Sequence, residues 1–230
     1  MATVILVRHG RTTANASGVL AGRAAGVELD DTGREQAAAT AGRLAGIPLA
    51  AVVSSPLERC VQTADFIRQQ QQSTPENVLD ADLIECDYGL WQGRTLSELA
   101  GEKLWSTVQI YPSAVSFPEG ESMFGMQTRA VAAIRSRDAA IEAEHGSSAV
   151  WVAVSHGDVI KSVLADALGL HLDLFQRLSV GPASASIVHY GATGVRVLAI
   201  NTEAGDLSWL APGLESAQAP VGGGSGHRAS

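Results

Sequence analysis

Residues 3–10 read TVILVRHG, and this stretch decides the fold of the chain. Five apolar or β-branched residues run directly into Arg-His-Gly, and a short apolar run bounded by a glycine is typical of a buried strand. The strand therefore carries Arg8 and His9 at its carboxyl end. Residues 149–154 (AVWVAV) form a second such run, which leads into Ser-His-Gly at His156. Ligands of open α/β sheets bind outside the carboxyl ends of the strands, so we expect His9 and His156 to meet there.

The charge balance of the chain restricts the class of partner. The 230 residues carry a net charge of −8, and 46% of them are hydrophobic. Nucleic acid binding needs a basic face, so we expect no nucleic acid partner. A small anionic substrate remains compatible with this charge, because a few local arginines can reverse the field inside one cleft.

Cysteine usage and hydropathy indicate a cytoplasmic protein. The two cysteines, Cys60 and Cys86, form no CxxC pair, which suits a reducing compartment. The apolar run at the N-terminus is too short for a signal peptide, and no run approaches the roughly 20 residues of a membrane span. We therefore expect a soluble chain without a membrane partner.

Predicted strands and helices alternate along the chain. Beyond the two runs above, strands are expected at residues 49–53, 78–84, 186–190 and 195–200. Helices are expected from Asp30 or Thr32 to about 46, after Ser55 as N-cap with Pro56 at the first helical position, over 121–145, and over 158–168. Residues 95–117 are less regular and are expected to form an excursion over the sheet with short helices.

This alternation predicts an α/β fold, namely a three-layer sandwich with a mainly parallel central sheet flanked by helices. The glycines at 191 and 194 predict a final hairpin, which makes one edge of the sheet antiparallel. We expect a single domain over residues 1–211 and a flexible Gly/Ser-rich tail over residues 212–230.

Basic groups gather at the predicted strand ends and helix starts. Arg8, His9 and His156 follow strands, and Arg59 lies in the first turn of a helix, where the helix dipole disfavours a cation. Helix N-termini favour anions, and the planar fork of arginine suits phosphate oxygens, so the pocket is predicted to bind phosphate. A metal site is the first rival interpretation, but the histidines lack paired ligand spacing and two arginines would repel a cation. Either histidine alone would be read as a satisfied polar residue at a strand end.

Four sequence blocks resemble the histidine phosphatase superfamily, whose members have the phosphoglycerate mutase-like fold. The blocks are Arg8-His9-Gly10 with Asn15, residues 54–59 (SSPLER) with 62–64 (QTA), residues 83–85 (LIE) with Gly89 and Gly93, and residues 155–157 (SHG). They occur in the order of the family, and the resemblance spans about residues 3–190.

The resemblance implies a role for each matching residue. His9 corresponds to the nucleophile that becomes phosphohistidine, and Glu85 to the proton donor that later activates water. The groups implied to hold the phosphoryl oxygens are Arg8, Arg59 and His156, with secondary contacts from Asn15, Gly22 and the backbone at Gly157. No metal and no cofactor is implied.

Physical chemistry is consistent with these roles. A histidine nucleophile must be neutral, and neighbouring cations lower its pKa. Two arginines and a cationic His156 would stabilise the phosphoryl group in flight without Mg²⁺. Glu85 must be protonated to assist an alkoxide leaving group, so burial or a nearby phosphate should raise its pKa, giving an acidic-to-neutral pH optimum. The alternative for Glu85 is a solvated loop carboxylate.

Other positions bear on the substrate rather than the reaction. Arg11 stands where the family has an acidic residue or Gln, and Ala21 where it often has a polar one, so both alter the rim of the cleft. Cys60 and Cys86 flank predicted site residues, and packing is favoured for both over an oxidation-sensitive thiol.

The segment between Glu85 and His156 separates phosphatase from mutase. It contains only 70 residues, whereas cofactor-dependent mutases carry a longer insertion with further basic residues. Arg94 and Lys103 are present, but no adjacent Arg pair, and the aromatic residues either pack the excursion or form a lid. We expect a phosphomonoesterase acting on a small phosphorylated metabolite. A phosphoglycerate mutase-type transferase and a catalytically silent phospho-ligand binder are the alternatives, and a homodimer is one expected assembly.

Overall fold

A six-stranded mixed sheet forms the centre of the computed structural model, which describes residues 2–73, 75, 77–205 and 221–224. The strands are β1 (Thr3–Arg8), β2 (Leu49–Ser54), β3 (Asn77–Leu79), β4 (Val150–Ser155), β5 (Ala185–Gly191) and β6 (Gly194–Thr202), in the order β3-β2-β4-β1-β5-β6. The first four strands of this order pair in parallel, and β5 and β6 are antiparallel. The predicted mainly parallel sheet with an antiparallel edge is confirmed.

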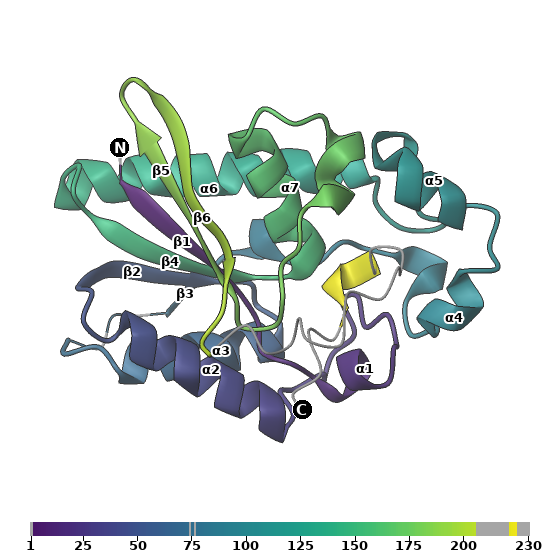
Figure 1. The fold of residues 1–230 in the computed structure, drawn as a ribbon, viewed down its shortest axis with the longest axis horizontal. Helices are drawn as coiled ribbons and strands as arrows, with labels where there is room; N and C mark the ends of the chain where they lie inside the picture. Colours follow the sequence, from purple (N-terminus) through teal and green to yellow (C-terminus); the bar gives the residue numbers. More distant parts are fainter. Residues whose placement is uncertain (1, 74, 76, 206–220, 225–230) are drawn as a thin grey trace.

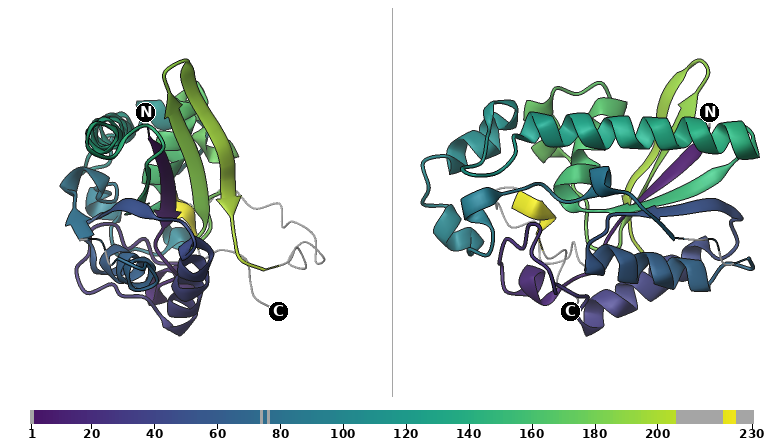
Figure 2. Two further views of the ribbon diagram at one scale, coloured as in Figure 1. Left: turned by 90° about the vertical axis from the view of Figure 1, so that its left-hand side faces the viewer. Right: turned by 180° about the vertical axis from the view of Figure 1, so that it is seen from behind.

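Helices cover both faces of the sheet and complete the three layers. They are α1 (Thr13–Ala16), α2 (Asp31–Leu44), α3 (Glu58–Gln69), α4 (Leu96–Leu99), α5 (Trp105–Ile110), α6 (Met123–His145) and α7 (Gly157–Ala167). α2 and α3 lie on one face, and α6 and α7 lie on the other (Figures 1 and 2). The short helices α4 and α5 belong to the predicted excursion and extend beyond the carboxyl ends of the strands (Figure 1).

Alternate side chains of β1 point to opposite faces of the sheet, and both sets are apolar, so helices must cover both faces. Ile5 and Val7 are buried in the apolar cluster that includes residues of α2 and α3. Val4 and Leu6 belong to the larger cluster, which includes residues of α6 and α7. A parallel strand that is apolar on both sides is stable only between two helical layers.

Several predicted boundaries are confirmed, and two predictions are wrong. α2 begins after Asp30, whose side chain caps the helix by accepting from the Gly33 amide, and α6 begins after Ser122. The strand predicted at 78–84 ends at Leu79, and a 3₁₀ turn at Ala81–Leu83 replaces the rest.

The second error concerns the start of α3. Its N-cap is Leu57, without a side-chain cap, so Ser55 is not the N-cap and Pro56 is not the first helical residue. The Ser55 hydroxyl accepts from the Leu57 amide at 3.4 Å and contacts His156 Nε2 at 2.8 Å, so its backbone partner lies before the first helical residue.

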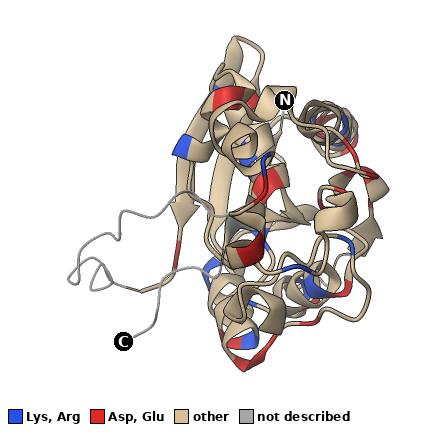
Figure 3. Cartoon of the chain, turned by 90° about the vertical axis from the view of Figure 1, so that its right-hand side faces the viewer, with Lys and Arg blue, Asp and Glu red and all other residues tan. Residues whose placement is uncertain are grey.

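Most of the predicted tail, residues 212–220 and 225–230, lies outside the described residues, while Val221–Gly223 form a 3₁₀ turn. Among the helices that the structure describes, none combines the length and apolar character needed to cross a bilayer. Acidic and basic segments are interspersed along the described chain (Figure 3).

Candidate active site

The two His-Gly strand ends lie side by side at the carboxyl edge of the sheet. β1 and β4 are direct neighbours with Arg8 opposite Ser155, and the His9 amide donates to the Ser155 carbonyl at 3.0 Å. The imidazole rings of His9 and His156 are 5.3 Å apart between centroids. The parallel pairing of two strands of similar length therefore brings together the two histidines that the sequence predicted to meet.

The hydrogen bonding of His9 determines which ring nitrogen can attack a substrate. Its Nδ1 lies 2.7 Å from the Gly10 carbonyl oxygen, which only accepts, so Nδ1 carries the proton. Nε2 then holds the lone pair. Burial, followed by the charges of Arg59 and Arg8, lowers the pKa of His9 well below its ordinary value of 6.5. The ring is therefore neutral at pH 7, as a nucleophile must be.

His156 is oriented by partners at both ring nitrogens. Arg59 Nη2 lies 3.3 Å from its Nδ1, and because an arginine only donates, Nδ1 is the acceptor. The proton is thus on Nε2, which donates to the Ser55 hydroxyl at 2.8 Å. Burial, followed by Arg59, lowers the pKa of His156 well below 6.5. His156 is therefore neutral with these partners, which differs from the expected cation. A phosphoryl dianion beside the ring would raise its pKa.

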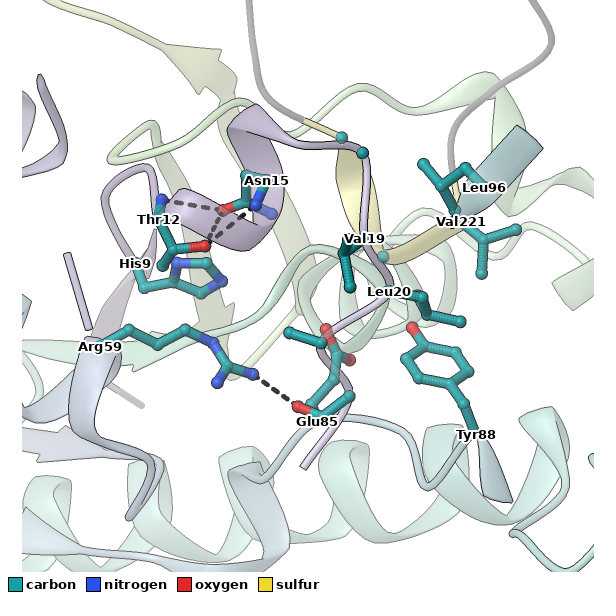
Figure 4. A pocket seen from close by; sticks show the side chains of 15 residues that line it. His9, Thr12, Asn15, Val19, Leu20, Arg59, Glu85, Tyr88, Leu96 and Val221 are labelled. Carbon is teal, nitrogen blue, oxygen red and sulfur yellow. Dashed lines mark hydrogen bonds between the residues drawn. The ribbon is translucent and has the colours of Figure 1, made fainter. Parts of the chain in front are cut away.

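Arg59 extends from the first turn of α3 into the pocket beside His9 (Figure 4). Its side chain is 2% exposed, and its Nη2 donates to the Gly22 carbonyl at 2.7 Å. The buried Nη1 has no hydrogen-bond partner among the described residues. An unpartnered N–H of a buried guanidinium is costly, and a phosphate oxygen is a matching acceptor.

Arg8 is fully buried at the end of β1. Its Nη1 donates to the Val180 carbonyl at 2.9 Å, which fixes the plane of the guanidinium. Burial lowers the pKa of Arg8 to about 10, so the side chain keeps its charge at pH 7. Arg8 thus supplies a second fixed cation next to His9.

Glu85 is a buried carboxyl group rather than a solvated one. It lines the pocket and is 4% exposed, and its Oε1 accepts from the Cys86 amide at 2.9 Å. Burial, and then the charge of the nearby Asp158, raises the pKa of Glu85 to about 7. Near neutral pH a large fraction of the molecules therefore hold a carboxylic acid there, which is the form a general acid needs.

Arg23, Glu121 and Arg129, which were not predicted from the sequence, form a charged cluster that holds the backbone of Glu85. Arg129 on α6 donates to the Glu85 carbonyl at 3.1 Å and to the Ile84 carbonyl at 2.7 Å. Arg23 donates to the same Glu85 carbonyl at 2.8 Å. Glu121 joins both arginines, at 2.6 Å from Arg129 and 2.9 Å from Arg23. The sequence showed Glu121 only as part of a helix start, because its partners lie far apart along the chain.

Replacement of Arg129 by methionine is expected to lower kcat for a phosphomonoester about tenfold, because Glu85 loses two of the donors that hold its loop and small misplacements of a proton donor are costly. The pH profile should change as well, with the basic limb moved or broadened. Steady-state kinetics from pH 5 to pH 9 provide the measurement.

Arg135→Met is the matched control, because Arg135 lies on the same helix but forms an exposed ion pair with Asp166. It should keep both kcat and the pH profile. Equal kinetics for the Arg129 and Arg135 variants would contradict a positioning role for Arg129.

Three of the candidate catalytic residues, His9, Arg59 and Glu85, line a small pocket. His9 and Arg59 lie on one side of it, and Leu96 and Val221 on the other (Figure 4). The cavity has a volume of about 30 Å³, and its lining residues are His9, Thr12, Asn15, Gly18, Val19, Leu20, Ala21, Gly22, Arg59, Glu85, Tyr88, Leu96, Val221, Gly222 and Gly224. Arg59 is the single cation among these described lining residues. Arg8 and His156 do not line the cavity but contact residues that do.

The three residues implied to make secondary phosphate contacts differ in whether they line the pocket. The Asn15 Oδ1 accepts from the Thr12 amide and hydroxyl at 3.2 and 3.0 Å, so its Nδ2 is the group left to donate to a phosphate. Gly22 lines the pocket with φ +54, a conformation that favours glycine. Gly157 does not line the pocket, but it is the first residue of α7, directly after His156.

Both cysteines are buried beside site residues. Cys60 Sγ lies 3.5 Å from His156 Nε2, and burial raises the pKa of this thiol to about 12. Burial also raises the pKa of Cys86 well above its ordinary value. Neither is a thiolate at pH 7, which agrees with packing as their main role.

The two departures from the family pattern lie in different places. Ala21 lines the pocket, whereas Arg11 turns away to the start of α2, where it donates to Asp30 and Thr32 at 2.8 Å each. Arg11 therefore contributes to the fold rather than to the pocket wall.

Most apolar side chains of the excursion pack against one another. Trp91 stacks on Trp105 at 6.1 Å and meets Phe117 edge-on at 5.3 Å. Leu96 is the side chain of α4 that reaches the pocket. In the described part of the chain, no group of three or more His, Cys, Asp or Glu side chains is arranged to hold a metal ion.

Comparisons with known proteins show which family the chain matches. Residues 4–203 match the family model described as the histidine phosphatase superfamily (branch 1). A bifunctional protein of Mycobacterium tuberculosis is 34% identical over 206 residues, covering 85% of this chain and 53% of that protein. The chain thus spans about half the length of these mycobacterial relatives. GpmB of Yersinia pestis, described as a probable phosphoglycerate mutase, is 32% identical over 192 residues, covering 83% of this chain and 86% of the relative.

Solved structures of similar fold agree with this family match. YhfR of Bacillus stearothermophilus superposes with a TM-score of 0.76 at 25% identity, over 86% of this chain and 96% of that one. A mycobacterial glucosyl-3-phosphoglycerate phosphatase in complex with VO3 gives a TM-score of 0.76 at 25% identity, over 87% and 99% of the two chains.

The mixed sheet with helices on both faces is the fold of the phosphoglycerate mutase-like α/β proteins. More narrowly, the chain belongs to the histidine phosphatase superfamily.

Proposed function

We propose that this protein is a metal-independent phosphomonoesterase that hydrolyses a small phosphorylated metabolite through a phosphohistidine on His9. The observation that carries the proposal is the state of the His9 ring. Its proton is held on Nδ1 by the Gly10 carbonyl, and two buried arginines lie beside it. A neutral imidazole with a free Nε2 among fixed cations is suited to attack on phosphorus.

The reaction would proceed in two displacements. His9 Nε2 forms a bond to phosphorus while the bond from phosphorus to the ester oxygen breaks, and Glu85 gives its proton to that oxygen. Water then attacks the phosphohistidine, Glu85 takes a proton from it, and the phosphorus–nitrogen bond breaks to release inorganic phosphate. Arg8, Arg59 and His156 would stabilise the equatorial oxygens in both steps.

The charges around the pocket favour hydrolysis over a mutase reaction. A phosphoglycerate has a carboxylate as well as a phosphate, and it would need a second cation in the wall. Among the described lining residues, Arg59 is the single cation, and the other walls are largely apolar, with Val19, Leu20 and Leu96. Arg94 is held by Glu102 at 2.7 Å.

The test is a screen for phosphate release from a panel of phosphomonoesters, run in parallel with interconversion of 2- and 3-phosphoglycerate in the presence of a bisphosphate primer. Phosphate release that EDTA does not reduce is the expected result. Isomerisation faster than release would favour the mutase, and phosphate binding without turnover of any ester would favour a silent binder.

A further inference from the structure

The segment 221–224 lies against the candidate active site, although it is remote from it in sequence. Its 3₁₀ turn, drawn in yellow, lies between α1, α4 and α7 (Figure 1). Val221 is 2% exposed and belongs to the main apolar core cluster. Val221, Gly222 and Gly224 all line the pocket that contains His9, Arg59 and Glu85. The segment is therefore part of the wall nearest the reacting groups.

Hydrogen bonds attach this segment to Arg8 and Asp158. Arg8 Nη2 donates to the Gly224 carbonyl at 2.5 Å and to the Gly222 carbonyl at 3.3 Å. The Gly222 amide donates to Asp158 Oδ2 at 3.0 Å. Two oxygens on one guanidinium nitrogen occupy a position that phosphoryl oxygens would take if Arg8 holds the phosphate.

The small volume of the pocket also indicates that residues 221–224 occupy space that a substrate would need. With residues 221–224 in place its volume is about 30 Å³. Pockets that hold small organic ligands measure about 300–1,000 Å³. With the segment seated, the enclosed space beside His9 and Arg59 is therefore small, of the order that ordered water fills.

Glycine is required at two of these positions. Gly222 has φ +72 and Gly224 has φ +62, in the region that other residues rarely adopt. A Cβ on Gly222 would lie 3.1 Å from Leu20 Cδ1. Three consecutive glycines at 222–224 thus allow the backbone itself to approach the arginine.

We propose that residues 221–224 occupy the phosphate-binding site of their own chain and compete with the substrate for Arg8. This inference rests on the proposed function. The substrate must displace the segment before it can reach Arg8 and His9. Its apparent affinity is therefore reduced by the fraction of molecules in which the segment is seated.

The test compares Gly222→Val in the full chain with Gly46→Val as the matched control. A β-branched residue is strongly disfavoured at φ +72, so the first variant releases the segment. Gly46 is exposed and has no positive φ, and nothing lies within 4 Å of a Cβ placed there. A second variant ends the chain after Pro220, and its control ends after Gly226, which keeps the Gly224 carbonyl in a peptide bond.

Calorimetric binding of inorganic phosphate and the KM for p-nitrophenyl phosphate are the readouts. If nine in ten molecules have the segment seated, release should lower both constants about tenfold. Both controls should behave as the full chain does.

Unchanged or weaker phosphate binding in the variant that ends after Pro220 would overturn the inference. Phosphate binding is measured without turnover, so it separates this inference from the proposed function. Tighter phosphate binding without hydrolysis of any ester would support the segment as a competitor and reject the phosphatase.

Discussion

His9→Ala is expected to lower kcat/KM for p-nitrophenyl phosphate by about 10⁴-fold or more, the largest effect of any single substitution in this chain. The variant loses the atom that forms the covalent intermediate, and removal of a nucleophile from a group of residues that act together costs several orders of magnitude. The cations that surround the ring remain, so phosphate binding should persist while turnover disappears.

Two measurements distinguish this result from general damage to the fold. His171→Ala removes an exposed imidazole that contacts Asp173 at 3.2 Å, and it should keep full activity. Quenched reactions of the unaltered protein should yield an acid-labile phosphoryl adduct on His9. An adduct that maps to His156, or activity that survives in His9→Ala, would reject His9 as the nucleophile.

Glu85→Gln is expected to lower kcat by about 10²- to 10³-fold for an alkyl phosphate, because the leaving alkoxide loses its proton donor. The loss should be much smaller for p-nitrophenyl phosphate, whose leaving group is stable as an anion. Glutamine keeps the shape of the side chain and an oxygen to accept from the Cys86 amide, so the loop should keep its structure. Equal losses for the two substrates would argue against general acid catalysis by Glu85.

The pH profile gives an independent check on the same residue. Burial raises the pKa of Glu85 to about 7, so the acid form that assists the leaving group is present below pH 7 and is lost above it. Burial and the arginines lower the pKa of His9 well below 6.5, so its neutral form persists into the acidic range. For an alkyl phosphate, kcat/KM should therefore be highest at acidic to neutral pH and fall by about tenfold per pH unit above 7.

In Glu85→Gln this basic limb should vanish. A rate in the unaltered protein that rises steadily to pH 9 would contradict the assignment of Glu85 as the acid.

The predictions that succeeded rest on patterns local to the chain. Apolar runs that end in Arg-His-Gly and Ser-His-Gly predicted buried strands, and the sheet places both ends at one edge. The strand expected at 78–84 failed because tertiary context converts its second half into a 3₁₀ turn that leads to Glu85. Ser55 was misassigned as a helix cap: its hydroxyl accepts from the Leu57 amide, before the first helical residue, and also contacts His156, 101 positions further along the chain.

By itself, the sequence determined which residues are candidates for the chemistry, because residue type and placement at strand ends and helix starts depend on short-range patterns. The tertiary structure decided the tautomers, the positions and the hydrogen-bond partners of those residues. The Gly10 carbonyl selects the His9 tautomer, Arg129 holds the Glu85 loop from another helix, and Gly222 contacts Arg8 across 214 positions. Such contacts join backbone atoms and distant side chains, whose pairing no local sequence pattern encodes. The tertiary structure therefore determines the protonation states of His9 and Glu85 and places residues 221–224 against Arg8.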